Sequence, residues 1–343
     1  MKKLLTTLYI TLPDAYLALK GENISIIQDD KSIGRVPLHN LEAICTFGRQ
    51  GASPALMAAC MERNIALTFL STSGRIRGRV IGMTNGNVTL RKTQYRISDD
   101  EEKSAEIARH FLVGKLYNAK WMLERMTRDH ALRIDVEKFK NTSSYLSNSM
   151  HQLLSIKDLE QLRGVEGNAA SAYFSLMDDM ILQQKEDFFF KGRNRRPPLD
   201  NVNALLSFAY TLLAADVGAA LETVGLDAYV GFLHRDRPGR MSLALDMMEE
   251  LRSVYADRFV LSIINKKQLQ ASDFVKKESG AVILTDDARK KIFELWHRKK
   301  DEKIMHPFLK EKISWGLVPH AQALLLARYI RGDLDAYPPF LWK

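Results

Sequence analysis

The sequence predicts an α+β protein with a small amino-terminal β-rich region, residues 1–97, and a larger all-α region, residues 98–343. Two observations carry this prediction. Short runs of β-branched and aromatic residues, separated by turn residues, fill the first part. After residue 98, apolar residues recur at the three- and four-residue spacing of a helix nearly to the end. The length of 343 residues suits two domains, at about 150 residues per domain.

The β-rich region contains segments with the composition of strands over residues 4–11, 16–20, 23–28 and 65–70. Gly21 and the Asp29-Asp30 pair favour turns between neighbouring segments. One helix interrupts the strands, because Ser53 can cap its amino end and Pro54 suits its first turn. A first strand also explains the apolar start MKKLLTTLYITL better than a signal peptide does, since threonines interrupt the run and no cleavage site follows.

The all-α region opens with the longest helical pattern of the chain, EIARHFLVGKLYNAKWMLERM, at residues 106–126. Apolar positions in this segment follow the helical period throughout. We expect further helices around residues 151–162, 166–186, 200–222, 241–256, 286–299 and 319–331. No internal repeat and no low-complexity linker divides this region.

The charge balance favours a polyanionic partner. Lys and Arg total 50 against 41 acids, a net charge of +9, which suits nucleic acid or an anionic membrane surface. The two cysteines, Cys45 and Cys60, lie in apolar stretches and cannot make a disulfide framework or a four-thiolate zinc site. No stretch reaches the roughly 18 uninterrupted apolar residues of a membrane span. These features predict a cytoplasmic protein.

The segment GFLHRDRPGRMSLALDMMEELR, residues 231–252, has the composition of a metal site. If Ser242 caps a helix there, Asp246, Glu249 and Glu250 share one face of that helix. A divalent cation would remove the repulsion between these acids, and oxygen ligands suit magnesium or manganese. His234 lies one loop away from the acids. The alternatives are a solvated acidic face and a structural histidine.

A second acid stands at the head of a predicted helix of small residues, LRGVEGNAASAYFSLM, residues 162–177. Glu166 lies between Gly164 and Gly167, where a backbone or a ligand can approach closely. Tyr173 follows two turns later on the same face and could line the same cleft. The alternative for Glu166 is an acid that complements the dipole of its helix.

Two groups of arginines are candidates for binding phosphates. Pro197 and Pro198 stiffen a basic loop, and Asp200 caps the apolar helix that follows it. A rigid basic loop can clamp phosphate groups, although a solvated loop has the same composition. The candidate phosphate contacts in this loop and around His234 are Arg193, Arg195, Arg196, Arg235, Arg237 and Arg240.

Three of these segments, in the order GVEGNAASAYF, RNRRPPLDNVNALLSFAYTLL and GFLHRDRPGRMSLALDMMEELR, resemble the core of a known family. It is the CRISPR-associated spacer-acquisition integrase family, the universal DNA integrase and endonuclease of CRISPR adaptation. The segment RVPLHNLEAICTFGRQGASPALMAACMERNIALTFLSTSGRIRGRV is similar to the β domain of that family. The resemblance covers essentially the whole chain and is closest to the versions that accompany type I-C systems.

The resemblance implies a β-rich interaction and dimerisation domain over residues 1–97 and an α-helical catalytic domain over residues 98–343. It also implies a homodimer, two of which flank a dimer of the small companion protein of CRISPR adaptation in a heterohexamer. By motif position, the metal ligands fall on Glu166, His234 and Glu249. Asp246 matches an acid often found in the site, and Glu250 is given no role beyond extending the acidic patch.

The implied activity is that of a metal-dependent DNA endonuclease and integrase, which inserts foreign DNA fragments into a CRISPR array during antiviral defence. The implied substrate is double-stranded and branched DNA. A divalent ion can neutralise the charge that develops when a 3′-hydroxyl or a water attacks a phosphodiester. The implied cofactor is Mg²⁺ or Mn²⁺, and the imidazole favours manganese, since nitrogen ligands suit softer ions.

Two other functions remain open on the residues alone. A non-catalytic DNA-binding scaffold would use the basic charge, and it would bind DNA equally well in the presence of a chelator. A metal-dependent phosphohydrolase acting on small nucleotides would have no preference for branched DNA. The sequence contains no nucleotide-phosphate loop in support of the second alternative.

Overall fold

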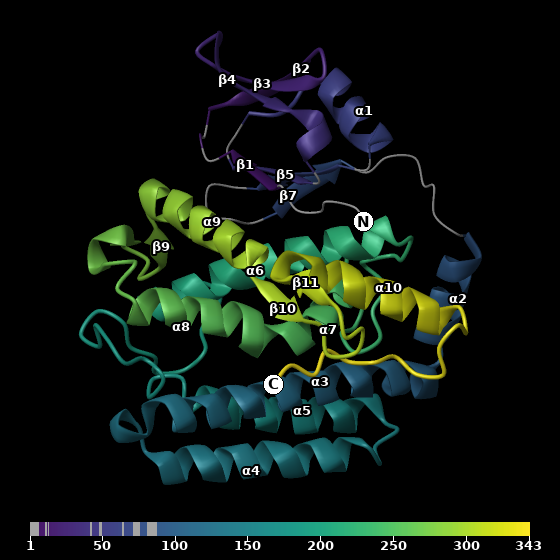
Figure 1. The fold of residues 1–343 in the computed structure, drawn as a ribbon, viewed down its shortest axis with the longest axis vertical. Coiled ribbons are helices and arrows are strands. Elements are labelled where there is room, and N and C mark those ends of the chain that lie inside the picture. Colours follow the sequence, from purple (N-terminus) through teal and green to yellow (C-terminus); the bar gives the residue numbers. More distant parts are fainter. Residues whose placement is uncertain are drawn as a thin grey trace. The chain divides into compact units, whose positions relative to one another are not determined.

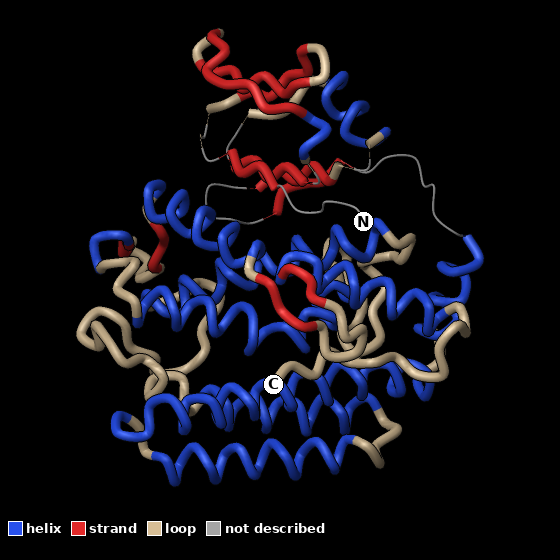
Figure 2. The backbone as a smooth tube through the Cα atoms, viewed as in Figure 1, coloured by secondary structure: helices blue, strands red, loops and turns tan. Residues whose placement is uncertain are grey.

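The computed structural model describes residues 7–10, 12, 14–41, 43–47, 50–63, 65–70, 76–80 and 88–343. Its contacts divide the chain into two compact units. Unit 1 consists of residues 1–85, 284–302 and 314–317, and unit 2 of residues 86–283, 303–313 and 318–343. Figure 1 shows the elements in sequence colours, and Figure 2 shows the strands in red and the helices in blue.

Among its described residues, unit 1 contains two sheets. The strands are β1 (Thr7–Ile10), β2 (Tyr16–Lys20), β3 (Asn23–Gln28), β4 (Lys31–Pro37), β5 (Ala43–Phe47), β6 (Ala66–Leu70) and β7 (Ile76–Val80). Strands β2, β3 and β4 form an antiparallel sheet. The other sheet has the order β1-β5-β6-β7, in which β1, β5 and β6 are parallel and β7 is antiparallel to β6. Asp29 and Asp30 both have positive φ at the predicted turn between β3 and β4.

The two sheets share one core with helix α1 (Pro54–Glu62). Leu17, Ile44 and Leu56 come from β2, β5 and α1, and none of them is exposed to solvent. Helix α1 begins as predicted, because the Ser53 hydroxyl accepts a hydrogen bond from the Leu56 amide at 3.2 Å.

A helix from late in the sequence belongs to unit 1. Helix α9 (Asp286–Asp301) stacks the ring of Phe293 on Tyr9 of β1, with 4.7 Å between ring centroids. The sequence predicted a single boundary near residue 97. By contacts, the first segment of unit 1 ends at residue 85 and the chain returns to unit 1 at residue 284, while the domain boundary near residue 97 stays a prediction. Hydrophobic periodicity identifies a helix but not the region against which it packs.

Unit 2 is mainly helical, which confirms the predicted α+β class with strands first and helices after. Its helices are α2 (Val88–Ser98), α3 (Glu101–His130), α4 (Val136–Leu153), α5 (Leu159–Phe174), α6 (Asn201–Thr223), α7 (Ser242–Met248), α8 (Arg258–Asn265) and α10 (Val318–Ile330). Two short pairs of strands lie between helices: β8 (Phe274–Lys276) with β9 (Val282–Leu284), and β10 (Lys303–Met305) with β11 (Lys312–Ser314).

The predicted helix bounds were wrong around residues 151–186. Helix α4 ends at Leu153, and α5 begins after Asp158, whose carboxylate accepts a hydrogen bond from the Gln161 amide at 2.7 Å. Helix α5 then ends at Phe174. Glu166 therefore lies in the middle of a helix rather than at its head, and the helix-dipole explanation of this acid does not apply.

Helix α6 is the one helix within the described parts of the chain that is long and apolar enough to cross a membrane. In the structure, 67% of its most apolar window is buried inside the protein, as in the core helix of a globular fold. It packs against α7, α8 and α10. Its start matches the prediction, since Asp200 caps it through the Asn203 amide at 2.7 Å.

Candidate active site

The acidic segment of residues 242–257 is not one continuous helix. Helix α7 ends at Met248, a 3-10 turn spans Glu249–Leu251, and a π-helical turn spans Arg252–Asp257. The predicted cap was wrong, because Met241 precedes the first helical residue and the Ser242 hydroxyl donates to the Arg235 carbonyl instead. The predicted common face was also wrong. The tightened turn directs Glu249 toward α3 and α5, and Glu250 toward α10 and the carboxyl-terminal segment.

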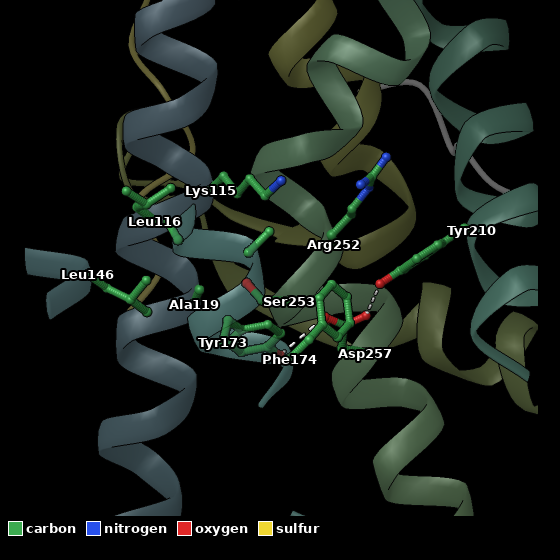
Figure 3. A pocket seen from close by; sticks show the side chains of 12 residues that line it. Lys115, Leu116, Ala119, Leu146, Tyr173, Phe174, Tyr210, Arg252, Ser253 and Asp257 are labelled. Carbon is green, nitrogen blue, oxygen red and sulfur yellow. Dashed lines mark hydrogen bonds between the residues drawn. The ribbon is translucent and has the colours of Figure 1, made fainter. Parts of the chain in front are cut away.

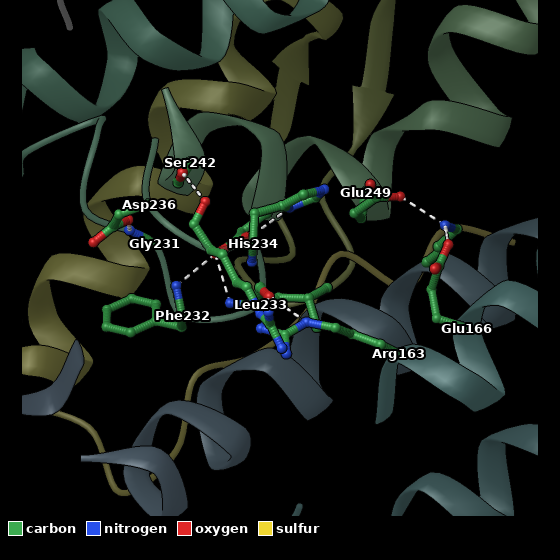
Figure 4. Close-up of polar contacts among 12 residues, drawn as sticks. Arg163, Glu166, Gly231, Phe232, Leu233, His234, Asp236, Ser242 and Glu249 are labelled. Carbon is green, nitrogen blue, oxygen red and sulfur yellow. Dashed lines mark hydrogen bonds and ion pairs between the residues drawn. The ribbon is translucent and has the colours of Figure 1, made fainter. Parts of the chain in front are cut away.

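Two of the predicted metal ligands converge on one ammonium group. Lys115 of α3 forms ion pairs with Glu166 of α5 and with Glu249, where its Nζ lies 2.8 Å from Oε2. Arg252 adds a second cation, with a guanidinium nitrogen 2.8 Å from Oε1 of Glu249. Figure 4 shows the side chains of Glu166 and Glu249 directed toward the same amine. Carboxylates far apart in the sequence therefore meet at one point.

The electrostatics of Glu249 follow from its two cationic partners. Its side chain is 3% exposed, and burial alone would raise the pKa of its carboxyl. The positive charges of Arg252 and Lys115, with a smaller electrostatic contribution from His234, outweigh the burial and lower this pKa to about 2. Glu249 is therefore ionised throughout the physiological range.

The third predicted ligand is held beside these acids by a buried aspartate. Asp246 has no exposed surface, and its oxygens accept hydrogen bonds from the backbone amides of Phe232 at 2.6 Å, Leu233 at 2.9 Å and His234 at 2.9 Å. Its Oδ1 also lies 2.5 Å from Nδ1 of His234. Because Nδ1 faces Asp246, Nε2 is the ring nitrogen left for a ligand. Asp246 thus orients His234 and fixes its loop.

Helix α5 is tied to the histidine loop by two arginines. Arg163 donates a hydrogen bond from Nε to the Leu233 carbonyl at 2.9 Å, next to His234. Arg235 reaches back to the Glu160 carboxylate at 2.5 Å. These contacts, visible in part in Figure 4, place Glu166 and His234 on facing elements. His234 and Glu249 lie close enough for the histidine to affect the pKa of the acid.

A cavity of about 30 Å³, enough for a water molecule, adjoins the site next to Lys115 and Arg252. Asp257 lines it and accepts hydrogen bonds from the hydroxyls of Tyr210 at 2.6 Å and Tyr173 at 3.1 Å (Figure 3). Burial raises the pKa of Asp257 to about 6, although the tyrosine hydroxyls and Arg252 oppose that rise. The predicted DNA contact Tyr173 is buried at 4% exposure, with its hydroxyl committed to Asp257.

Four of the predicted phosphate-binding arginines form one basic surface. Arg195, Arg196 and Arg237 are exposed, and Arg240 is half-buried. Burial and the positive charges of the other three lower the pKa of Arg240, so the two basic loops lie within electrostatic range of each other. Such clustered positive charge suits a polyanion.

The other two arginines of the set are bonded within the protein. Arg193 donates to Oδ1 of Asn203 at 2.7 Å and to the Ser207 hydroxyl at 3.1 Å, so it braces the basic loop against α6. Arg235 is exposed but pairs with Glu160. Residues 1–6 and 71–75 of the amino-terminal region lie outside the described part of the chain.

The donor set fits a divalent cation, although no three His, Cys, Asp or Glu side chains of the described residues are grouped closely enough to hold one as they stand. Lys115 lies between the two glutamates. Glu249 Oε2 is buried, and its close partner is the Lys115 ammonium at 2.8 Å. Two carboxylates and one imidazole nitrogen are ligands that suit manganese and magnesium.

Sequence reasoning missed Lys115 and Arg252, the cations of this site. Lys115 lies in the apolar periodic segment of α3. A lysine on the inward face of such a helix predicts an acidic partner, because buried lysines are rarely unpaired. Arg252 follows the acidic run and could only be assigned once the π-helical turn was known.

Comparison with known proteins identifies the family. The family described as "CRISPR associated protein Cas1" matches residues 8–298. The chain is 49% identical to "CRISPR-associated endonuclease Cas1 1" of Chlorobaculum tepidum and 47% identical to "CRISPR-associated endonuclease Cas1 2" of Rhodospirillum rubrum, and in both cases the alignment covers 100% of each protein.

Solved structures share the fold. The structure titled "Casposase bound to integration product" matches with a TM-score of 0.83 and 22% identity, over 98% of this chain and 93% of the other. A "Cas6-RT-Cas1--Cas2 complex" matches with a TM-score of 0.81 and 24% identity, over 100% of this chain and 36% of the other. The predicted family and the enzyme class of its relatives are confirmed: this chain belongs to the Cas1 family of CRISPR-associated proteins.

Proposed function

We propose that this chain is a metal-dependent DNA endonuclease and integrase that inserts DNA fragments into a CRISPR array. The observation that carries the proposal is the convergence of Glu166 and Glu249 on Lys115, with His234 oriented beside them by Asp246. Membership of a family whose relatives are named endonucleases supports the same reaction class.

Glu166, Glu249 and Nε2 of His234 are the proposed ligands of Mg²⁺ or Mn²⁺. Bound there, a divalent ion would neutralise charge developing on the phosphate and lower the pKa of the attacking hydroxyl. Glu249 needs no deprotonation to serve, since its pKa of about 2 keeps it ionised. Lys115 must give up one of its two carboxylate contacts when the ion binds.

The chain's own residues supply the rest of the chemistry. The attacking oxygen belongs to a 3′-hydroxyl in integration and to water in hydrolysis. It loses a proton and bonds to phosphorus as the bond to the leaving oxygen breaks and that oxygen gains a proton. Arg252, whose guanidinium pairs with Glu249 at 2.8 Å, is a half-buried cation close to this charge. Arg195, Arg196, Arg237 and Arg240 are proposed to hold the DNA backbone, with Arg235 beside them.

The proposed partners are branched and double-stranded DNA, a second copy of this chain, and a small companion protein of the Cas2 type in a heterohexamer. A protein of the same fold in a complex with Cas2 supports the companion. The β-rich amino-terminal region is proposed as the dimerisation and interaction domain and the helical region as the catalytic domain, in a cytoplasmic enzyme that accompanies a type I-C system.

The proposal is tested with a labelled branched DNA that mimics a half-integrated fragment, incubated with protein and Mn²⁺, Mg²⁺ or chelator. We expect metal-dependent strand cutting and rejoining, reduced at least about 1000-fold in Glu166→Ala and His234→Ala, because each removes a ligand. His151→Ala on α4, an exposed histidine, is the matched control. Activity that survives both ligand variants would exclude the site. Equal binding in chelator with no turnover would favour the scaffold function.

A salt series in the same assay tests the basic surface. Arg237→Ala should weaken binding to DNA of any sequence. It should also reduce the slope of log affinity against log salt concentration by about one, because one phosphate contact is lost. An unchanged slope would remove Arg237 from the proposed DNA path.

A further inference from the structure

Glu250, adjacent to the proposed metal ligand Glu249, lies in a polar centre whose hydrogen-bond donors carry no charge. Its side chain is fully buried, with no exposed surface. Its carboxylate accepts hydrogen bonds from the Tyr337 hydroxyl, from the Phe340 amide at 2.6 Å and from Nε2 of Gln322 at 3.2 Å. All three donors are uncharged, and two belong to the carboxyl-terminal segment, residues 337–342. This geometry is that of an anchor for the segment rather than of a metal ligand.

Asn118 of α3 joins the same partners from the opposite side. Its buried amide nitrogen donates to the Glu250 carbonyl at 2.7 Å and to the Phe340 carbonyl at 2.6 Å. Its amide oxygen accepts from the Trp342 amide at 3.0 Å. One side chain therefore ties the turn that carries Glu249 and Glu250 to a segment about 90 residues later, which runs beside α3 in Figure 1.

Gly114 permits the close approach of α3 to this turn. A Cβ added at Gly114 would lie 2.9 Å from Cβ of Glu250, 3.2 Å from its Oε2 and 3.2 Å from Cβ of Pro339. Neighbouring positions of α3 thus contact successive parts of one turn: Gly114 packs on Glu250, Lys115 pairs with Glu249, and Asn118 binds the Glu250 backbone. A shift at Glu250 is passed to Glu249 through the single peptide between them.

We propose that Glu250, Asn118 and the segment 337–342 form a clasp that fixes the turn bearing Glu249 against α3, which makes Glu250 a positioning residue for the metal site. The inference rests on the proposed function for its activity readouts. The clasp acts through Glu249, so its loss displaces a ligand without removing one. Displacements of about 1 Å at a reacting centre commonly cost about 100-fold in rate.

The conservative variant separates a clasp from a ligand. In Glu250→Gln the amide oxygen can accept from Phe340, and the amide nitrogen can donate to the Tyr337 hydroxyl, which both donates and accepts. We expect Glu250→Gln to retain kcat and Mn²⁺ affinity within about threefold of wild type, whereas Glu250→Ala lowers kcat about 10- to 100-fold with little change in KM. A loss in Glu250→Gln as large as that in Glu249→Gln would overturn the proposal and make Glu250 a ligand.

Gly114→Ala tests the clasp without altering any polar group. We expect kcat to fall about 10-fold or more, because the added methyl displaces Glu250 or Pro339. Arg128→Ala, an exposed change on the same helix, is the control. Near-ultraviolet circular dichroism verifies that each variant is folded. Wild-type kcat in folded Gly114→Ala would overturn the proposal.

Release of the carboxyl-terminal segment provides a readout that does not depend on catalysis. Carboxypeptidase digestion of the full chain should remove Trp342 faster from Glu250→Ala and from Tyr337→Phe than from wild type, and Mn²⁺ binding followed by electron paramagnetic resonance should weaken in step. These two measurements test the clasp even if wild type proves inactive on DNA, an outcome that would refute only the proposed function. Faster digestion with unchanged Mn²⁺ affinity would overturn the positioning role.

Discussion

Glu249 and Glu250, two neighbouring acids of unit 2, are buried to a similar degree, but their pKa values shift in opposite directions. Glu249 and Glu250 are 3% and 0% exposed, yet the pKa of Glu249 is lowered to about 2 and that of Glu250 is raised to about 7. The difference lies in their partners. Lys115 and Arg252 bring positive charge to Glu249, whereas Tyr337, Gln322 and a backbone amide offer Glu250 only neutral donors. Neutral donors do not offset the desolvation of a carboxylate as ammonium and guanidinium groups do.

The same contrast divides the surroundings of the site into two regions. The cation-paired region holds Glu166 and Glu249, which both pair with Lys115, and the low pKa of Glu249 keeps that carboxylate ionised. The neutral-donor region holds Glu250 and Asp257, each fixed by tyrosine hydroxyls. The first region suits the binding of a metal ion and phosphate, and the second suits a support that must not attract either.

The largest expected effect comes from replacing each of the two neighbouring glutamates by glutamine, which removes the carboxylate charge. In chelator, Glu249→Gln should lower the free energy of unfolding by about 4 kcal/mol, because it leaves Arg252 and Lys115 short of a buried partner. Glu250→Gln should cost less than about 1 kcal/mol near pH 7, since its donors can still be satisfied. Urea denaturation measures both. Equal losses would show that the charge of the partner does not distinguish the two regions.

A smaller effect is expected in the pH dependence of stability. The pKa of Asp257 rises from its ordinary 3.8 to about 6 in the folded protein, so the folded state holds this proton over a range in which the unfolded state has lost it. Stability from this group is present below pH 4 and falls as the pH rises to 6, by about 3 kcal/mol in total. Asp257→Asn should reduce the fall measured in urea titrations at pH 4.5 and 7 by that amount, and should leave the part contributed by Glu250, whose pKa is raised to about 7. If the variant keeps the wild-type slope, another group carries the proton.

The smallest of the three effects concerns Asp246, a buried acid whose donors are backbone amides and an imidazole. Asp246→Asn can still accept from the amides but holds His234 less firmly in the right tautomer. We expect Mn²⁺ affinity to fall about 10- to 100-fold, the usual cost of losing the carboxylate behind a histidine ligand. Asp236→Asn, an exposed neighbour in the same loop, is the control for a Mn²⁺ titration. Unchanged affinity would mean that the loop backbone alone orients the imidazole.

Much of the fold could be predicted because its signals are local. The Ser53 and Asp200 caps, the turn at Asp29-Asp30 and the period of α3 each depend on residues within a few positions. The apolar start was expected to be a strand over residues 4–11, and β1 spans Thr7–Ile10 within the described residues.

The site was less predictable because it depends on pairing between distant segments. Motif resemblance selected Glu166, His234 and Glu249 as ligands, which remains a prediction. Helical periodicity placed Glu249 and Glu250 on one face, and this was wrong because the chain tightens and then widens between Met248 and Arg258. No local pattern could reveal that Lys115 lies between two acids from other elements.

The return of α9 to unit 1 has a consequence for how the chain can be dissected. Crossings between the units occur after residues 85, 283, 302, 313 and 317, so no single cut separates them. A fragment ending near residue 97 would lack Phe293 and leave Tyr9 without its stacking partner. The β-rich unit therefore gains its last helix only when the late part of the chain has been synthesised. Unit 1 is therefore not one contiguous stretch of sequence that recombination could exchange as a block.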